Sequence, residues 1–283
     1  MENSNKDFEV FASKYQKEEK EILILTSDGG GGAQKMGDSW DASKYFLAYI
    51  DIASNELKKG DGRVNWIISE EESKEHGCSW PYYFKGGVIY RLKVRELIDK
   101  TVPEGRLPSY YNRFMVIDVI EENVLNDELL AILAEYRKPV KIADKVLGEF
   151  ELDKDLELFN GAINWLEKNI SVSLEVNVDN KSSWNKAMNV LRNLFEQQIQ
   201  QDSEFRDFAA EQLTDLANDW IQDDNTPEIS KGDFTCRISL SELAVTSSGD
   251  YTAYYDDDDM FLGHVVTVSG NIETGIKSAV IEG

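Results

Sequence analysis

The second half of the chain opens with apolar residues that alternate with polar ones. The stretch 147–176 holds three such runs, and Asn160-Gly161 lies between the first two. Both central residues of a type I′ turn need positive φ, so this dipeptide predicts a two-residue hairpin turn. The hairpin would place on one face Leu156, Leu158, Ile163 and Trp165. A third strand is predicted by Ile170, Val172, Leu174 and Val176, which alternate with Ser171, Ser173 and Glu175. The pattern predicts an antiparallel β-meander.

Two amphipathic helices are predicted after the meander, because apolar residues then recur every three or four positions. The first helix follows Ser182-Ser183 and carries Trp184, Met188, Leu191, Phe195 and Ile199. The second begins near Asp202 or Ser203 and carries Phe205, Phe208, Leu213, Leu216 and Trp220. Aromatic stripes at this spacing are typical of core packing, so we expect both helices to cover one face of the sheet.

The last third returns to strands. Alternation in residues 234–241 predicts a strand that buries Cys236 as a packing thiol. Residues 251–255 and 260–269 predict a hairpin whose exposed tip is Asp256-Asp257-Asp258-Asp259. Leu262, His264, Val266 and Val268 would share a face, so we expect His264 to be buried and hydrogen-bonded.

The first half is mainly β. Phe8, Phe11 and Tyr15 predict one short helix, and strands are predicted at 21–26, 46–52, 64–69, 88–95 and 114–120. Asn126 as N-cap and Pro139 as a stop predict a helix over 126–137. The sequence therefore predicts an α+β protein of two domains. A mainly-β domain spans 1–143. A domain of β-meander, two helices and β-hairpin, built on an antiparallel sheet, spans 144–283.

Two features of the first half bear on binding. Gly29 to Gly32 follow a strand, but neither Gly-Lys-Ser/Thr nor G-x-G-x-x-G is present, so a flexible loop is favoured over a nucleotide site. Arg91, Lys93 and Arg95 alternate with apolar residues, which places three cations on one face. That face is interpreted as solvated; the alternative is a docking surface for an acidic partner, such as the other half of this chain.

Charge distinguishes the two halves. The whole chain has 30 basic and 53 acidic residues, a net charge of -23. Residues 1–143 contain 20 basic and 25 acidic residues (20 − 25 = −5), and residues 144–283 contain 10 and 28 (10 − 28 = −18). Such a surface repels nucleic acid and anionic membranes, and favours cations or a basic protein partner. Solubility alone is the alternative explanation.

No feature of the sequence indicates export, membrane insertion or a cofactor. The longest apolar run is the six residues Leu129 to Ala134, and the N-terminus lacks a signal-peptide pattern. Cys78 and Cys236 have neither metal-site nor redox spacing. We therefore expect a cytoplasmic protein with reduced thiols, no bound metal and no cofactor.

Several blocks in residues 147–283 resemble the bacterial family catalogued as domain of unknown function 2262 (DUF2262). They are 147–153 (LGEFELD), 159–165 (FNGAINW), 208–210 (FAA), 216–220 (LANDW), 254–257 (YYDD), 261–264 (FLGH) and 268–270 (VSG). The resemblance implies no activity. It implies a glycine in the aspartate turn, where this chain has Asp258. Residues 1–143 resemble no family.

The sequence favours binding over catalysis. No nucleophile with a base, carboxylate pair or metal set has diagnostic spacing, since the two histidines occur without HExxH or CxxC, and the four aspartates lack the EF-hand pattern. We expect a non-enzymatic intracellular protein that binds a basic partner, in its specific form an immunity protein that neutralises a toxin. The alternatives are a housekeeping adaptor and an enzyme of unrecognised type. The expected partner-binding residues are Asp219, Asp223, Asp224, Asp256, Asp257, Asp258 and Asp259.

Overall fold

The structure is a computed structural model that describes residues 2–221 and 226–283. The chain is α+β, as predicted, and divides into two compact units, Met1–Lys138 and Pro139–Gly283. The expected boundary near residue 144 lies a few residues after this division. Strand β6 (Lys141–Asp144) pairs with β7 of the second unit, so the residues before 144 join the second sheet.

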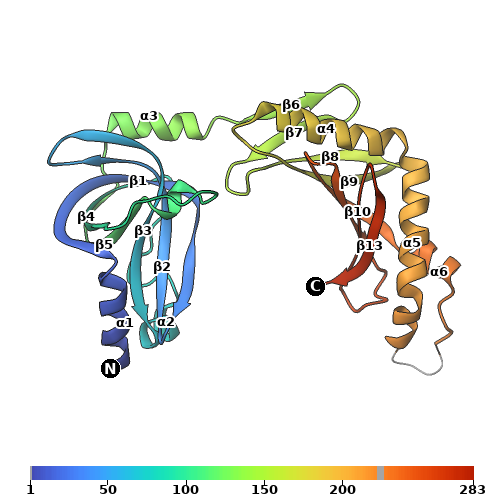
Figure 1. Ribbon diagram of the computed structural model, residues 1–283, viewed down its shortest axis with the longest axis horizontal. Coiled ribbons are helices and arrows are strands. Elements are labelled where there is room, and N and C mark those ends of the chain that lie inside the picture. The colour runs from blue at the N-terminus through green and yellow to red at the C-terminus, as the bar shows by residue number, and fades with distance from the viewer. Residues whose placement is uncertain (1, 222–225) are drawn as a thin grey trace. The chain divides into compact units, whose positions relative to one another are not determined.

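The first unit is a closed five-stranded barrel in the order β1-β2-β3-β5-β4 (Figure 1). Its strands are β1 (Tyr15–Met36), β2 (Ser39–Asp51), β3 (Glu56–Ser69), β4 (Ile89–Leu97) and β5 (Arg113–Glu122). All neighbours are antiparallel except β3 and β5. Helix α2 (Glu70–His76) joins β3 to β4. This strand order and closure are those of an OB-fold.

Alternating apolar residues build the barrel core, as the pattern predicted. Tyr90, Leu92 and Val94 of β4 are buried beside Ile22 and Ile24 of β1. Helix α1 spans Glu2–Ala12, helix η1 spans Pro108–Tyr110, and α3 spans Asp127–Tyr136. Asn126 caps α3 by accepting a hydrogen bond from the Leu129 amide at 3.0 Å, so the predicted N-cap is confirmed.

The glycine run lies within β1, so the prediction of a flexible loop is wrong. The register with β2 shifts between Thr26 and Gly31, after which Gly31 pairs with Lys44. A Cβ on Gly30 would come within 1.9 Å of the Tyr45 ring, and Gly31 has a φ of +136°. The glycines therefore let β1 bulge and approach β2 closely without leaving the barrel.

The three cations of β4 have carboxylate partners on β1. Arg91 donates to Glu21 through Nε at 2.9 Å, and Arg95 donates to Glu19 at 2.7 Å. Lys93 lies 3.6 Å from Glu19. The hydrogen bond from Arg95 is the main reason that the pKa of Glu19 is lowered. The cationic face is thus neutralised within its own unit.

The second unit is built on an eight-stranded sheet in the order β13-β12-β11-β10-β9-β8-β7-β6. Its other strands are β7 (Gly148–Asp153), β8 (Leu158–Trp165), β9 (Lys168–Glu175), β10 (Ser239–Thr246), β11 (Asp250–Asp256), β12 (Val265–Asn271) and β13 (Gly275–Glu282). The sheet is antiparallel, as predicted, except that β9 and β10 are parallel because helices connect them. The sequence predicted three strands, two helices and three strands for this unit. The structure has β6, a third helix and β13 in addition.

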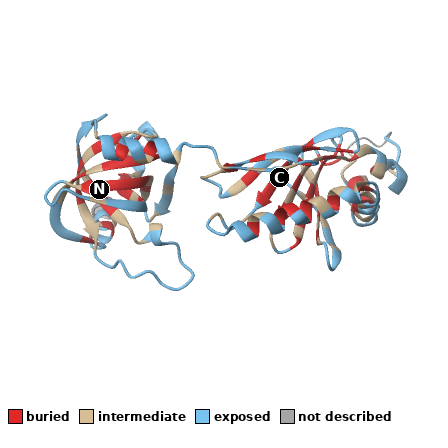
Figure 2. Ribbon diagram, turned by 90° about the horizontal axis from the view of Figure 1, so that it is seen from above, coloured by how far each residue is buried: buried red, intermediate tan, exposed pale blue. Residues whose placement is uncertain are grey.

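The helices cover one face of this sheet and bury its apolar residues (Figure 2). They are α4 (Lys181–Glu196), α5 (Gln198–Asp219) and α6 (Lys231–Arg237). Helix α4 has Asn180 as its N-cap, and α5 begins four residues before the predicted start at Asp202. Met188 and Leu191 lie in the core as predicted, whereas Ile199 is 77% exposed.

Asn160-Gly161 is not a turn, so that prediction is wrong. Both residues lie inside β8, where Gly161 pairs with Val172 of β9. A Cβ on Gly161 would come within 2.3 Å of the Phe150 ring, so the glycine makes room for that ring. The two-residue turn is instead formed by Leu166 and Glu167, which have φ of 48° and 69° as type I′ requires.

The correct register changes which residues of β8 face the core. The buried set is Phe159, Ile163 and Trp165, whereas Leu156 precedes the strand and is 66% exposed. Leu158 is half-buried. Ile163 and Trp165 share the buried face as predicted, whereas the prediction is wrong for Leu156 and Leu158, because the misplaced turn shifted that side of the hairpin by one residue.

Residues 231–237 form helix α6, not the start of a strand. Ser230 and Asp233 make a reciprocal capping box, which starts the helix and overrides the period-two pattern. Phe234 remains buried, but Cys236 is exposed, so its predicted role as a packing thiol is wrong.

Replacing Asp144 by asparagine is expected to flatten the acid dependence of stability. Arg192 first, then the amides of Leu147 and Val146, lower the pKa of Asp144 to about 2. The unfolded carboxyl has a pKa of about 3.9, so its stabilisation is complete above that pH and is lost as pH falls through about 2. Urea unfolding at pH values between about 5 and 2 would measure the difference. Asp207→Asn is the control; parallel curves for the wild type and D144N would contradict the prediction.

Candidate functional site

The aspartate turn between β11 and β12 is only partly a free surface. Asp257 is 5% exposed, and its carboxylate accepts hydrogen bonds from the amides of Phe261 at 2.5 Å and Asp259 at 3.2 Å. The expectation of four exposed aspartates is therefore wrong for Asp257, which organises the turn. Asp258 has a φ of 50°, a conformation that glycine adopts without strain, which fits the glycine implied at this position.

The other expected partner-binding aspartates differ in whether they already contact a cation of their own unit. Asp258 is exposed but binds Arg237 Nε at 2.9 Å, and Asp256 lies 3.8 Å from Lys168. Asp259 and Asp219 are exposed, the latter at the end of α5. Asp223 and Asp224 lie outside the described residues. The turn is thus bound to cations of its own unit at two positions.

His264 is half-buried at the start of β12. Its Nδ1 lies 2.7 Å from the Phe261 carbonyl oxygen, so the predicted hydrogen bond is confirmed. Its ring meets Trp220 edge-on at 5.2 Å. Leu262 is 60% exposed with a φ of 55°, so it does not share the buried face of Val266 and Val268. The contacts of His264 are those of a packing residue.

The sheet face opposite the helices presents a polar surface. Its outward residues on β9 to β13 are mostly serine, threonine and glutamate, because the apolar half of each strand points to the helices. Glu175, Glu242, Tyr254 and Glu282 lie on this face and are together termed the carboxylate cluster. Glu175 and Glu282 are exposed, and Glu242 and Tyr254 are half-buried.

Strand pairing brings the carboxylate cluster together across β9 to β13. Glu242 of β10 pairs directly with Tyr254 of β11, and Tyr254 pairs with Thr267 of β12. Ser173 donates to Glu242 at 3.3 Å, and Thr267 donates to Glu282 at 3.5 Å. Two of the three carboxylates thus lie beside a hydroxyl group of a neighbouring strand.

The negative charge of the cluster affects the pKa of Tyr254. The pKa of its phenol is raised, first by burial and then by Glu282, Glu242 and Glu175. Among the described residues, none of the three glutamates has a cation within ion-pair distance. The cluster is therefore a negative surface with no internal counter-charge in the described part of the chain.

Family comparison covers most of the chain in two segments. Residues 144–281 match an uncharacterized protein family conserved in bacteria. That family is DUF2262. The resemblance found in the sequence is thereby confirmed, and the match begins inside β6 and ends inside β13. Residues 7–136 match a different family, described as a domain of unknown function (DUF7021). The DUF2262 segment carries the whole carboxylate cluster except Glu282, which is one residue beyond it.

Other comparisons add no activity. No curated protein matches the chain. In the part of the chain that the structure describes, no helix is both long and apolar enough to cross a bilayer. Within the same residues, no group of three or more histidine, cysteine or acidic side chains could hold a metal ion.

The carboxylate cluster was not among the residues expected from the sequence. Glu175 alternates with buried Val172 and Leu174 in β9, so its outward direction was readable. The sequence does not say that β9 pairs in parallel with β10, nor that β13 exists. The sites of Glu242 and Glu282 beside Tyr254 depend on both facts.

Proposed function

We propose that the second unit binds a basic protein through the uncovered face of its sheet, and that this partner is a toxin which the protein neutralises. The supporting observation is the carboxylate cluster, three negative charges around a half-buried tyrosine on the sheet face opposite the described helices. Tyrosine is enriched at protein interfaces, since it supplies both apolar area and a polar hydroxyl.

The charge balance of the second unit also supports a basic partner. Residues 139–283 contain 11 basic and 28 acidic residues (11 − 28 = −17), against 19 and 25 in residues 1–138 (19 − 25 = −6). At least seven of those 11 cations already bind carboxylates within the unit. The surplus is negative and raises the association rate of a cationic protein.

A toxin that acts on nucleic acid would be a suitable partner. Such an enzyme needs a cationic groove for its polyanionic substrate. An acidic face can cover that groove and exclude the substrate without any chemistry of its own, which accords with a non-enzymatic function. An adaptor that binds another basic protein would use the same face. The activity of the captured partner, toxic or not, distinguishes the immunity function from the adaptor function.

The test is capture of partners from the native cell lysate with full-length protein. A triple variant, Glu175→Gln with Glu242→Gln and Glu282→Gln, is compared with a control that removes three charges from the helices, E196Q/D207N/D215N. We expect the captured protein to be basic, and the triple glutamine variant to associate about tenfold more slowly. The control should bind nearly as the wild type does.

The salt dependence of association and a growth assay complete the test. Raising salt from about 0.05 to about 0.5 M should slow wild-type association, because the Debye length shrinks. Coexpression of the present protein should restore the growth of a host that produces the captured protein. Capture of an acidic protein, or equal association by both variants, would refute the interface. A basic partner without toxicity would support the adaptor alternative instead.

A further inference from the structure

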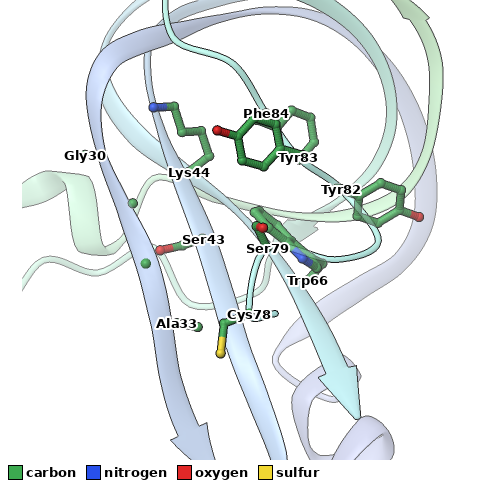
Figure 3. Close-up of a pocket in the computed structure, with 12 residues that line it drawn as sticks. Gly30, Ala33, Ser43, Lys44, Trp66, Cys78, Ser79, Tyr82, Tyr83 and Phe84 are labelled. Carbon is green, nitrogen blue, oxygen red and sulfur yellow. The ribbon is translucent and has the colours of Figure 1, made fainter. Parts of the chain in front are cut away.

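The first unit contains a pocket of about 400 Å³ between strands β1, β2 and β3 and the loop that follows α2. Gly30 to Ala33 of β1, Ser43 and Lys44 of β2 and Trp66 of β3 form one side, and the loop 78–84 forms the other. In Figure 3, Trp66, Ser79 and Phe84 are grouped on one side of the strand that bears Ser43 and Lys44. This volume lies within the usual range of small-molecule sites.

The wall of the pocket is a packed set of aromatic rings. Trp66 lies 5.2 Å from Phe84 and 6.1 Å from Tyr82, measured between ring centroids. Tyr82 also donates to the Ile117 carbonyl at 3.3 Å, which fixes the loop to β5. Tyr83, by contrast, is 76% exposed at the rim. The pocket thus has a rigid aromatic wall and one exposed ring that is free to pack on a ligand.

The pocket carries little net charge in an acidic protein. Among the described residues, no carboxylate lines the pocket, and the only cation is Lys44, which donates to the Gly29 carbonyl at 3.0 Å. Lys44 also helps to lower the pKa of Asp28, although the hydrogen bond from Arg137 is the main cause of that shift. The first unit as a whole has a net charge of −6 (19 − 25), which opposes binding of a polyanion. A neutral ligand is therefore favoured over a nucleic acid.

We propose that this pocket binds a neutral saccharide. A sugar ring has an apolar face of C–H groups that can pack on Tyr83 and Trp66, and a rim of hydroxyls that can pair with Ser79 and Lys44. Gly32 has open space where a side chain would stand, which lets such a ring approach the strand closely. This assignment is independent of the basic-partner interface.

The test uses three neutral disaccharides, maltose, cellobiose and diacetylchitobiose, with the full-length protein. Saturation-transfer NMR detects binding, and tryptophan fluorescence gives the Kd. At least one should bind, and Y83A should raise its Kd about tenfold or more through lost stacking. Trp80→Ala is the matched control, because Trp80 lies in the same loop but does not line the pocket.

Two further measurements separate this proposal from its rivals. Saccharide affinity should be unchanged by salt between about 0.05 and about 0.5 M, since the ligand is neutral. It should also be unchanged in the triple glutamine variant of the carboxylate cluster. Binding of none of the three disaccharides, a Kd unaffected by Y83A, or preferential binding of oligothymidylate or glucose 6-phosphate would each overturn the proposal.

Discussion

Replacing Asp202 by alanine is expected to lower the free energy of unfolding of the second unit by about 3 kcal/mol. Asp202 is 6% exposed on α5 and binds Arg206 Nε at 2.5 Å. It also accepts from Trp165 Nε1 at 3.3 Å and from the Tyr255 hydroxyl at 3.4 Å. Alanine would leave a half-buried guanidinium and two buried donors without this acceptor.

The network around Asp202 joins four elements, which is why its loss should be felt through the unit. Arg206 also donates to the Thr235 carbonyl at 2.9 Å and to that of Ile238, at the end of α6. Trp165 belongs to β8 and Tyr255 to β11. Burial first and then Asp202 raise the pKa of Tyr255 well above its usual value, so the phenol stays a donor at neutral pH.

Hydrogen exchange of the full-length protein, read by mass spectrometry on peptides from α5, β8 and β11, would measure the effect. Asp207→Ala is the control, because Asp207 lies on the same helix but is exposed. Its effect should stay within about 0.5 kcal/mol. A loss of less than about 1 kcal/mol in D202A would show that the network contributes little.

Replacing Gly161 by alanine is expected to destabilise the second unit by about 2 kcal/mol. The added Cβ would lie within 3 Å of three atoms of the Phe150 ring, which is fully buried. The ring would have to move into a packed core, since the neighbouring side chains leave no adjacent space.

Asn160→Ala serves as the matched control and also decides between turn and strand. In a type I′ turn both residues need positive φ, so both substitutions would be harmful. In β8, Asn160 is exposed and points away from the core, so its replacement should have little effect. Urea unfolding followed by circular dichroism distinguishes these outcomes. Equal losses at both positions would contradict the strand assignment.

The sequence by itself determined the fold class and most of the elements. Alternation identified β2 to β5, because each of these strands has one buried face, although β2 and β3 begin at Ser39 and Glu56, well before the predicted starts at 46 and 64. Local hydrogen bonding fixed the start of α3, since Asn126 caps it through a residue three positions away. The residue blocks in 147–283 were also sufficient to identify the DUF2262 family, and the family match confirms this identification.

The tertiary structure decided what depends on residues far apart in the chain. Gly161 has the sequence context of a turn but serves the Phe150 ring, and Asp257 has the context of an exposed tip but satisfies buried amides. Glu242 and Glu282 meet Tyr254 only because β9 pairs with β10 and β13 extends the sheet. Local pattern records which way a side chain points, whereas pairing between distant strands determines what it meets.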